Sequence, residues 1–226
     1  MGSSVLIVYY SLTNQTAMVI HNIAAVLHKR GYKTDIHRIR PIDDWCLPLT
    51  KAAFARQALQ TFAGLPLRCA IEEMHLNRLD YEHVILGWQP WFLRPSIPVE
   101  SFLKSTMGRV VRGRKVWLVG TCRSMWSLAQ EILTIRIERL GGKVMGGMMV
   151  GGELQSAANL ISYGYYILNA GDVPESHWIR RLEPNWKGFG IGEGGILKGL
   201  HYGHFLAESL DGKHPEGPPT WVRVNV

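Results

Sequence analysis

Hydroxyl side chains are concentrated just after the first apolar run of the chain. Residues 5–10 form this run, and Ser11, Thr13 and Thr16 follow it within six residues. If the segment joins a buried strand to a helix, the first N–H groups of that helix are unpaired and bind anions together with nearby hydroxyls. A helix cap alone needs only one hydroxyl. The segment therefore predicts an anion site that would accept a phosphate monoester without lysine or arginine.

Aromatic side chains gather in a proline-rich loop after another apolar run, residues 83–87. This loop contains Trp88, Gln89, Pro90, Trp91, Phe92, Arg94 and Pro95. Flat aromatic faces at the end of a strand suit a planar ligand. The same residues would equally suit a loop that packs on residues 40–80, and the sequence leaves both interpretations open.

A third polar segment, residues 121–126, follows an apolar run and precedes a predicted helix. Arg123 would hydrogen-bond carbonyl oxygens of a ligand or neutralise an anionic ring. Cys122 is interpreted as a small buried apolar residue, because nothing beside it in sequence would lower its pKa.

Two patterns near the C-terminus carry less chemical information. Residues 190–195 match the dinucleotide motif G-x-G-x-x-G, but no clear strand precedes them, so we predict a flexible glycine-rich loop. His201, Tyr202 and His204 are the candidate catalytic bases if the C-terminal extension covers the ligand. Histidines in such a pair are more often structural.

The composition indicates a globular chain with a basic surface. Of its 226 residues, 46% are hydrophobic and 19% are charged, and the net charge is +7. A basic surface suits an acidic partner. The basic residues are scattered and form no known nucleic-acid module, so we do not expect a nucleic-acid partner.

Cysteines and the N-terminus bear on the compartment. Cys46, Cys69 and Cys122 are odd in number and widely spaced, which argues against a disulfide framework and favours a reducing cytoplasm. We see no signal peptide and no apolar run long enough for a membrane span. No metal-ligand spacing is present, so we expect no metal site.

The elements that must position these loops alternate between strand and helix. Strands are predicted at residues 5–10, 33–39, 83–87, 115–120 and 144–150, and helices at residues 15–30, 51–62, 71–79, 99–105, 127–140 and 159–168. This alternation predicts an α/β fold with a parallel sheet, whose ligands bind at the carboxyl ends of the strands. Residues 1–152 would form this domain, and residues 153–226 an extension packed on it.

Three segments of the chain resemble those of a known family. Residues 11–16 resemble the flavodoxin phosphate loop S/T-x-T-G-x-T, residues 81–102 resemble the segment that flanks the flavin ring, and residues 121–126 correspond to the second flavin loop. The resemblance implies a flavodoxin-like doubly wound five-stranded sheet, order 2-1-3-4-5, with FMN as cofactor. Asn14 stands where the motif has Gly, and Asn tolerates the left-handed conformation better than most residues.

The resemblance also implies which residues contact FMN. The phosphate would be bound by Ser11, Thr13, Asn14, Gln15 and Thr16. One side of the ring would be flanked by Gln89, Pro90, Trp91 and Phe92. The pyrimidine end of the ring would face Thr121, Cys122, Arg123 and Met125.

A narrower likeness concerns residues 88–98 and 122–126, which look like motifs of dialkylresorcinol condensing enzymes. It implies a flavin-dependent oxidoreductase that oxidises a cyclohexanedione to an aromatic resorcinol in aryl-lipid or polyketide-type biosynthesis, with Arg94 or Arg123 stabilising the enolate. The substrate would be small and apolar, and an acidic carrier protein would deliver it. Flavodoxin-like enzymes often form dimers, so a homodimer fits the resemblance.

Three other functions stay open. An NAD(P)H-dependent quinone or nitro reductase shares the fold and the flavin. An electron-transfer flavodoxin is a second alternative, although shuttles of that family are typically acidic and this chain is basic. A binding module that has lost the flavin is the third, and Asn14 is the feature that keeps it open.

Overall fold

A computed structural model describes residues 4–42, 45–63, 68–76, 80–91, 93–122, 126–151, 164–170, 174, 177–178, 191–213 and 220–225. The elements are β1 (Ser4–Tyr9), α1 (Gln15–Lys29), β2 (Lys33–Arg38), α2 (Lys51–Phe62), β3 (His83–Trp88), β4 (Pro90–Trp91), β5 (Arg94–Pro95), α3 (Ile97–Lys104), η1 (Met107–Val111), β6 (Lys115–Thr121), α4 (Ser127–Arg139), β7 (Lys143–Gly151), α7 (Gly192–Leu210) and β8 (Thr220–Asn225).

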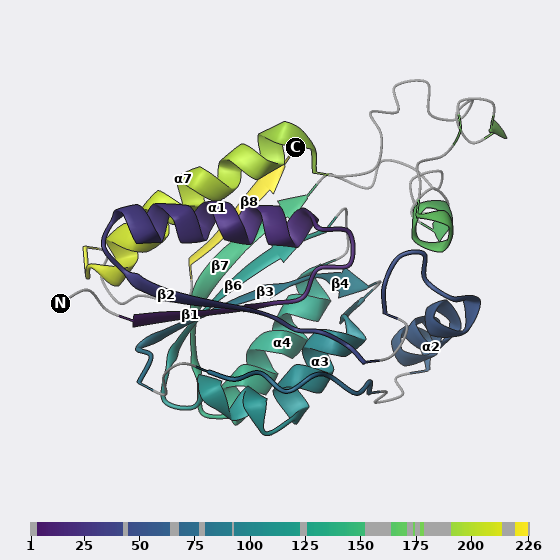
Figure 1. Cartoon of the computed structure of the whole chain (residues 1–226), viewed down its shortest axis with the longest axis horizontal. Coiled ribbons are helices and arrows are strands. Elements are labelled where there is room, and N and C mark those ends of the chain that lie inside the picture. Colours follow the sequence, from purple (N-terminus) through teal and green to yellow (C-terminus); the bar gives the residue numbers. More distant parts are fainter. Residues whose placement is uncertain are drawn as a thin grey trace.

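The centre of the molecule is a parallel sheet with the strand order β2-β1-β3-β6-β7-β8. Its first five strands are the five predicted from the sequence, in the predicted order, which confirms the flavodoxin-like α/β fold. The carboxyl ends of these strands meet at one edge of the sheet, from which the turn into α1 and the β4–β5 hairpin emerge (Figure 1).

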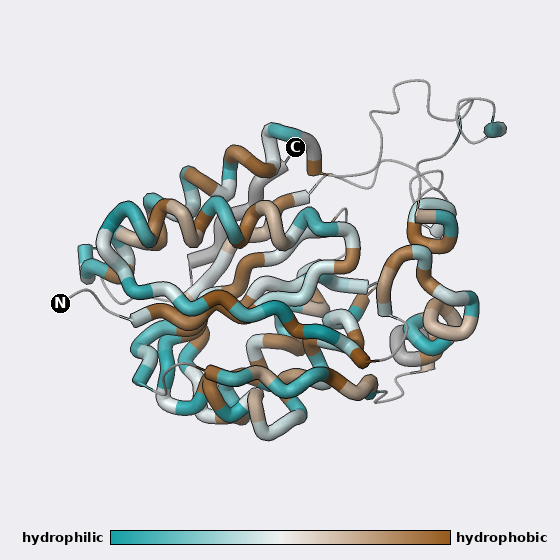
Figure 2. The backbone as a smooth tube through the Cα atoms, viewed as in Figure 1, coloured by the Kyte–Doolittle hydropathy of each residue, from teal (hydrophilic) through white to brown (hydrophobic). Residues whose placement is uncertain are grey.

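Burial on both faces explains the continuous apolar runs. Every residue of β1 and β3 is buried, as expected for strands at the centre of a sheet covered on both sides. Helices α1 and α7 cover one face and α3 and α4 cover the other (Figure 1). Apolar and polar residues alternate along α1 and α7 (Figure 2). Helix α1 buries its apolar side against the sheet, including Val19, Ile20 and Ile23.

The extension adds two elements to this sheet. Helix α7 packs beside α1, and β8 pairs in parallel with β7 as a sixth strand. This strand was not predicted from the sequence. The flexible loop predicted at residues 190–195 is wrong over its described part, because residues 192–195 form the first turn of α7. No helix within the described residues combines the length and the apolar character that a membrane span needs.

The segment between β2 and β3 lies partly beyond the carboxyl edge. Helix α2 has its predicted bounds and is capped by Thr50, whose hydroxyl accepts a hydrogen bond from Ala53 N at 3.1 Å. The helix predicted over residues 71–79 is wrong over its described part. Residues 71–76 form no helix, and Ile71 forms an antiparallel bridge with Pro41.

Candidate functional site

The turn between β1 and α1 is built around one left-handed residue. Asn14, directly before α1, has φ 58° and ψ −3°. This region favours glycine, and asparagine enters it more readily than most residues with a side chain. The position where the phosphate-loop motif has Gly therefore keeps the backbone conformation that glycine would supply.

The start of α1 presents backbone donors. Ser11 is fully buried, and its Oγ accepts a hydrogen bond from Ala17 N at 3.2 Å. The first hydrogen bond of the helix type runs from Met18 N to Asn14 O. No described residue accepts a hydrogen bond from the backbone N–H groups of residues 13–16. Four consecutive donors around a left-handed residue at a helix start form the arrangement that binds anions.

A buried polar cluster joins the three predicted loops. Thr16 Oγ1 lies 2.7 Å from Thr121 Oγ1 and 3.2 Å from the side-chain amide of Gln89. In the amide orientation that satisfies both of its ends, Gln89 donates to Thr16 Oγ1 and accepts from Trp91 Nε1 and Leu12 N, each at 3.2 Å. The carboxyl ends of β1, β3 and β6 are thus connected by side chains that are less than a tenth exposed.

In this amide orientation, one hydroxyl hydrogen of the cluster is left without an acceptor. Two hydroxyls carry two O–H hydrogens, and the bond between Thr16 and Thr121 uses one of them. Because Gln89 donates to this pair through its NH₂ group, the other hydrogen has no acceptor in the cluster. A buried donor of this kind is normally satisfied. An acceptor oxygen on a ligand would complete the cluster.

The two described aromatic residues of the second loop, Trp88 and Trp91, are packed inside the protein. Trp91 is only 3% exposed, its ring lies 5.3 Å from that of Trp45 and 5.8 Å from that of Tyr10 (centroid to centroid), and Trp88 is fully buried. Tyr10 also donates from its hydroxyl to Trp45 O at 2.9 Å. Of the two interpretations left open, these contacts match a loop that packs on residues 40–80.

The other predicted ring contacts are placed only in part. Gln89 and Pro90 are buried, whereas Phe92, Arg123 and Met125 lie outside the described residues. Cys122 is half-buried, and its N–H donates to Val150 O at 2.9 Å. A Cβ on Gly151 would meet Cys122 O at 1.6 Å, so the third loop lies directly against the end of β7 and requires glycine there.

The candidate bases do not lie at this edge. Helix α7 runs beside α1, and His204 Nδ1 lies 3.4 Å from Nη2 of Arg30, which directly follows the C-terminus of α1. Tyr202 is 3% exposed in the helix–sheet core, and burial raises the pKa of its hydroxyl. His201 is on the exposed side of α7. A catalytic role for them requires that the extension cover the ligand, and α7 instead packs along α1, so we assign them no role in catalysis.

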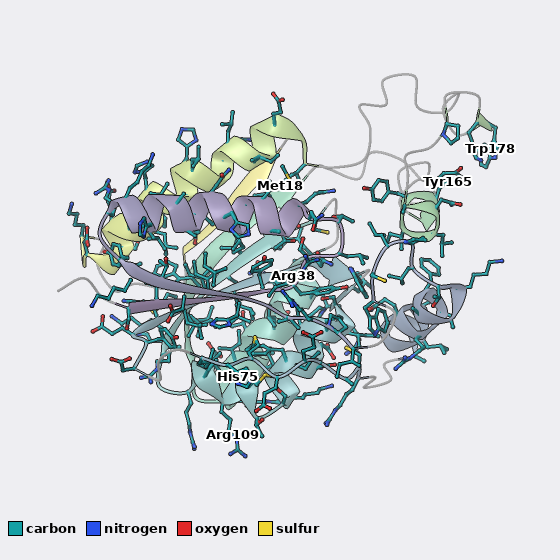
Figure 3. The ribbon with its side chains drawn as sticks, viewed as in Figure 1. Met18, Arg38, His75, Arg109, Tyr165 and Trp178 are labelled. Carbon is teal, nitrogen blue, oxygen red and sulfur yellow. The ribbon has the colours of Figure 1, made fainter. Side chains whose placement is uncertain are left out.

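One basic residue beside the turn was missed. Arg38 ends β2, pairs with Tyr9 in the ladder, and donates from Nη2 to the carbonyl oxygen of Ser11 at 2.8 Å (Figure 3). Lysine and arginine are scattered along the sequence, so residue type alone gave no signal. Only the register between β1 and β2 brings this exposed guanidinium to the turn.

Comparisons with known proteins were made by sequence and by structure. No family model matches the chain, and no curated protein sequence matches it. Solved structures match its fold at low sequence identity. An archaeal flavodoxin has a TM-score of 0.50 at 12% identity, covering 93% of this chain and 99% of that chain.

Two further structures agree. The flavoprotein from Lactobacillus acidophilus NCFM, determined by NMR in its apo-form, has a TM-score of 0.50 at 17% identity and covers 66% of this chain and 93% of that one. A candidate flavoprotein from Bacteroides uniformis ATCC 8492 has a TM-score of 0.52 at 18% identity, over 72% and 98% of the respective chains. These similarities define the fold of this chain as flavodoxin-like.

Proposed function

We propose that the chain binds FMN at the carboxyl edge of its sheet and acts as a flavin-dependent redox protein. The observation that carries the proposal is the left-handed Asn14 in the turn before α1, with the four backbone donors of residues 13–16. The flavodoxin and the flavoprotein that share the fold support a flavin as the ligand.

The donor set suits the phosphate end of FMN. The backbone N–H groups of residues 13–16 would hold the phosphate oxygens, since anions bind at helix starts. The Ser11 oxygen already accepts a hydrogen bond from Ala17 N, which leaves its own O–H hydrogen to donate to the phosphate. The spare hydrogen of the Thr16–Thr121 pair would reach a further ligand oxygen. Bound FMN supplies hydride acceptance and electron exchange, while the protein supplies position and charge.

The absorption spectrum of the purified protein tests this proposal. We expect a yellow protein with flavin absorbance from about 350 to 500 nm, or a colourless one that quenches the fluorescence of added FMN. Protein that neither contains flavin nor takes up FMN would contradict the proposal and favour the cofactor-free binding module.

For the reaction, we propose the oxidation of a cyclic diketone to its aromatic resorcinol. The support is the resemblance at residues 88–98 and 122–126. Arg94 adds to it, because this half-buried arginine pairs with Trp91 in the β4–β5 hairpin and would place a cation near a developing enolate. In balance, the ring loses one hydride to the flavin and one proton from the neighbouring carbon, and dioxygen takes up the electrons.

Two assays separate this reaction from the alternatives. Aerobic incubation with cyclohexane-1,3-dione should yield resorcinol, detected by chromatography. Anaerobic addition of NADPH should leave the flavin oxidised. Rapid bleaching by NADPH without resorcinol formation would instead favour the quinone or nitro reductase, and inactivity in both assays would favour an electron carrier.

A further inference from the structure

Arg38 places a full positive charge beside a turn whose donors are otherwise neutral. Its guanidinium carries five N–H hydrogens, and one nitrogen donates to the carbonyl oxygen of Ser11. Within the described part of the chain, no carboxylate forms an ion pair with Arg38. Among these residues, the charge of Arg38 is therefore not neutralised by a carboxylate, and one of its nitrogens contacts the turn.

Charge is the property that separates the phosphorylated flavin from the unphosphorylated one. A phosphate monoester carries close to two negative charges above about pH 6. Residues 10–16 contain no cation, and backbone N–H groups supply only partial charges. At physiological salt, charges are screened over a length of about 8 Å. The Arg38 guanidinium, which is hydrogen-bonded to Ser11, lies within that distance of the turn.

We propose that Arg38 makes this site select phosphorylated flavin over riboflavin by reading the charge of the phosphate. This inference rests on the proposed function and adds a specificity residue to it. The competing explanation is that Arg38 only positions the turn through the Ser11 carbonyl. Loss of a positioning residue would weaken FMN binding without changing its salt dependence, whereas loss of a residue that reads charge would also reduce that salt dependence.

The experiment measures the dissociation constants of FMN and riboflavin by fluorescence titration of the full chain. The variants are Arg38→Gln, which removes the charge, and Arg38→Lys, which keeps it. Arg40→Gln is the matched control, because Arg40 is also exposed near the end of β2 but pairs with Glu72 at 3.8 Å. Circular dichroism and thermal melting establish that each variant is folded.

We expect Arg38→Gln to weaken FMN binding about tenfold and to change riboflavin binding less than about twofold. Arg38→Lys should keep most of the preference for FMN, and Arg40→Gln should behave like the parent. Raising the salt concentration should weaken FMN binding more in the parent than in Arg38→Gln, because the charge interaction is screened. Between pH 5 and 7.5, the rise in FMN affinity should likewise be smaller in Arg38→Gln.

Other results would overturn the inference. Weakened FMN binding with an unchanged salt response would assign Arg38 to positioning, and unchanged FMN affinity with an unchanged salt response would assign it no role at the site. Both results are distinct from failure of the proposed function, in which the parent chain binds no FMN at all and the inference falls with it.

Discussion

At the scale of single residues, the β1–α1 turn depends on the conformation of Asn14. A residue with φ 58° avoids strain only if its side chain tolerates the left-handed region. Glycine does so without a Cβ, asparagine does so at a small cost, and β-branched residues do so poorly. The identity of residue 14 therefore affects both stability and the orientation of the neighbouring N–H groups.

Substitutions at Asn14 should separate these cases. We expect Asn14→Gly to leave the free energy of unfolding within about 1 kcal/mol of the parent and to retain FMN binding. Asn14→Val should lose about 1–2 kcal/mol and weaken FMN binding, because valine resists φ > 0. Urea unfolding and FMN titration measure both effects. Normal stability and FMN affinity in Asn14→Val would show that the turn does not need the left-handed conformation.

Gln89 is the second residue on which the site depends, because its amide contacts Leu12, Thr16 and Trp91. We expect Gln89→Met to cost about 1–3 kcal/mol of stability, since it leaves buried donors without acceptors. It should also alter the near-ultraviolet signal of Trp91.

Gln57→Met is the matched control for this change. Gln57 is also buried, and it accepts from Ile97 N at 3.4 Å, at the start of α3 and not at the β1–α1 turn. Both variants should lose stability, and only Gln89→Met should weaken FMN binding. Equal losses of FMN affinity in the two variants would argue against a specific role for the Gln89 cluster.

At the scale of elements, the close approach of α7 to α1 holds the helix that carries the turn. Gly195, Gly199 and Gly203 recur at every fourth position of α7, and a Cβ at Gly199 would lie 3.1 Å from Val19 O. Asn22 Nδ2 also donates to Ile196 O at 2.9 Å. These contacts explain why this glycine-rich segment is a helix, although glycine is a weak helix former.

Substituting glycines of α7 should separate the effect of helix propensity from the effect of packing against α1. Alanine favours a helix over glycine by about 1 kcal/mol, but at position 199 it would press on the backbone of α1. We expect Gly199→Val to lose about 3 kcal/mol and to weaken FMN binding by displacing the start of α1. Gly194→Ala, at an exposed position of the same helix, should gain up to about 1 kcal/mol. Thermal melting checks both, and a stabilised Gly199→Val would contradict this packing.

At the scale of the whole molecule, one buried histidine links stability to pH. His83 begins β3, is 7% exposed, and its Nδ1 has no hydrogen-bond partner within the described residues. Burial lowers the pKa of His83 below its ordinary 6.5; Glu82 opposes this and Lys115 adds to it. Below about pH 6.5 the unfolded chain therefore binds more protons at this position than the folded protein does.

The sign of the pH effect follows from this difference. Stability should fall as the pH drops from about 6.5 to the lowered pKa of folded His83 and should level off below it, with about 1.4 kcal/mol for each tenfold difference in proton affinity. His83→Gln should reduce this decline in urea unfolding between pH 7.5 and 5. His28→Gln, an exposed histidine on α1, is the control and should follow the parent. An unchanged decline in His83→Gln would rule out this histidine as its source.

Elements set by local sequence signals could be predicted, whereas elements that depend on contacts between distant residues could not. The strands β1, β3, β6 and β7 and the helix α1 were predictable, because continuous apolar runs and helical spacing are local signals. Strand β8 was missed because it follows a Gly- and Pro-rich stretch and joins the sheet only through its partner β7. The first turn of α7 was misjudged because a glycine repeat indicates a loop unless a neighbouring helix is known.

The candidate site could likewise be predicted only in part. The convergence of the three loops was predictable, because parallel strands end at one edge, and Thr16, Gln89 and Thr121 do meet there. The burial of Trp91 under Trp45 could not be predicted, since these residues are far apart in sequence. Arg38 was missed for the same reason, because it reaches Ser11 only through the pairing of β1 with β2.

The stacked indoles of Trp45 and Trp91 give the molecule a built-in optical probe. With ring centroids 5.3 Å apart and planes tilted by 32°, their electronic transitions should couple. The near-ultraviolet dichroism of the unlabelled protein would then contain a paired band that originates at this one loop. Any ligand that moves either ring would change that band, so occupancy at this edge becomes visible without a dye.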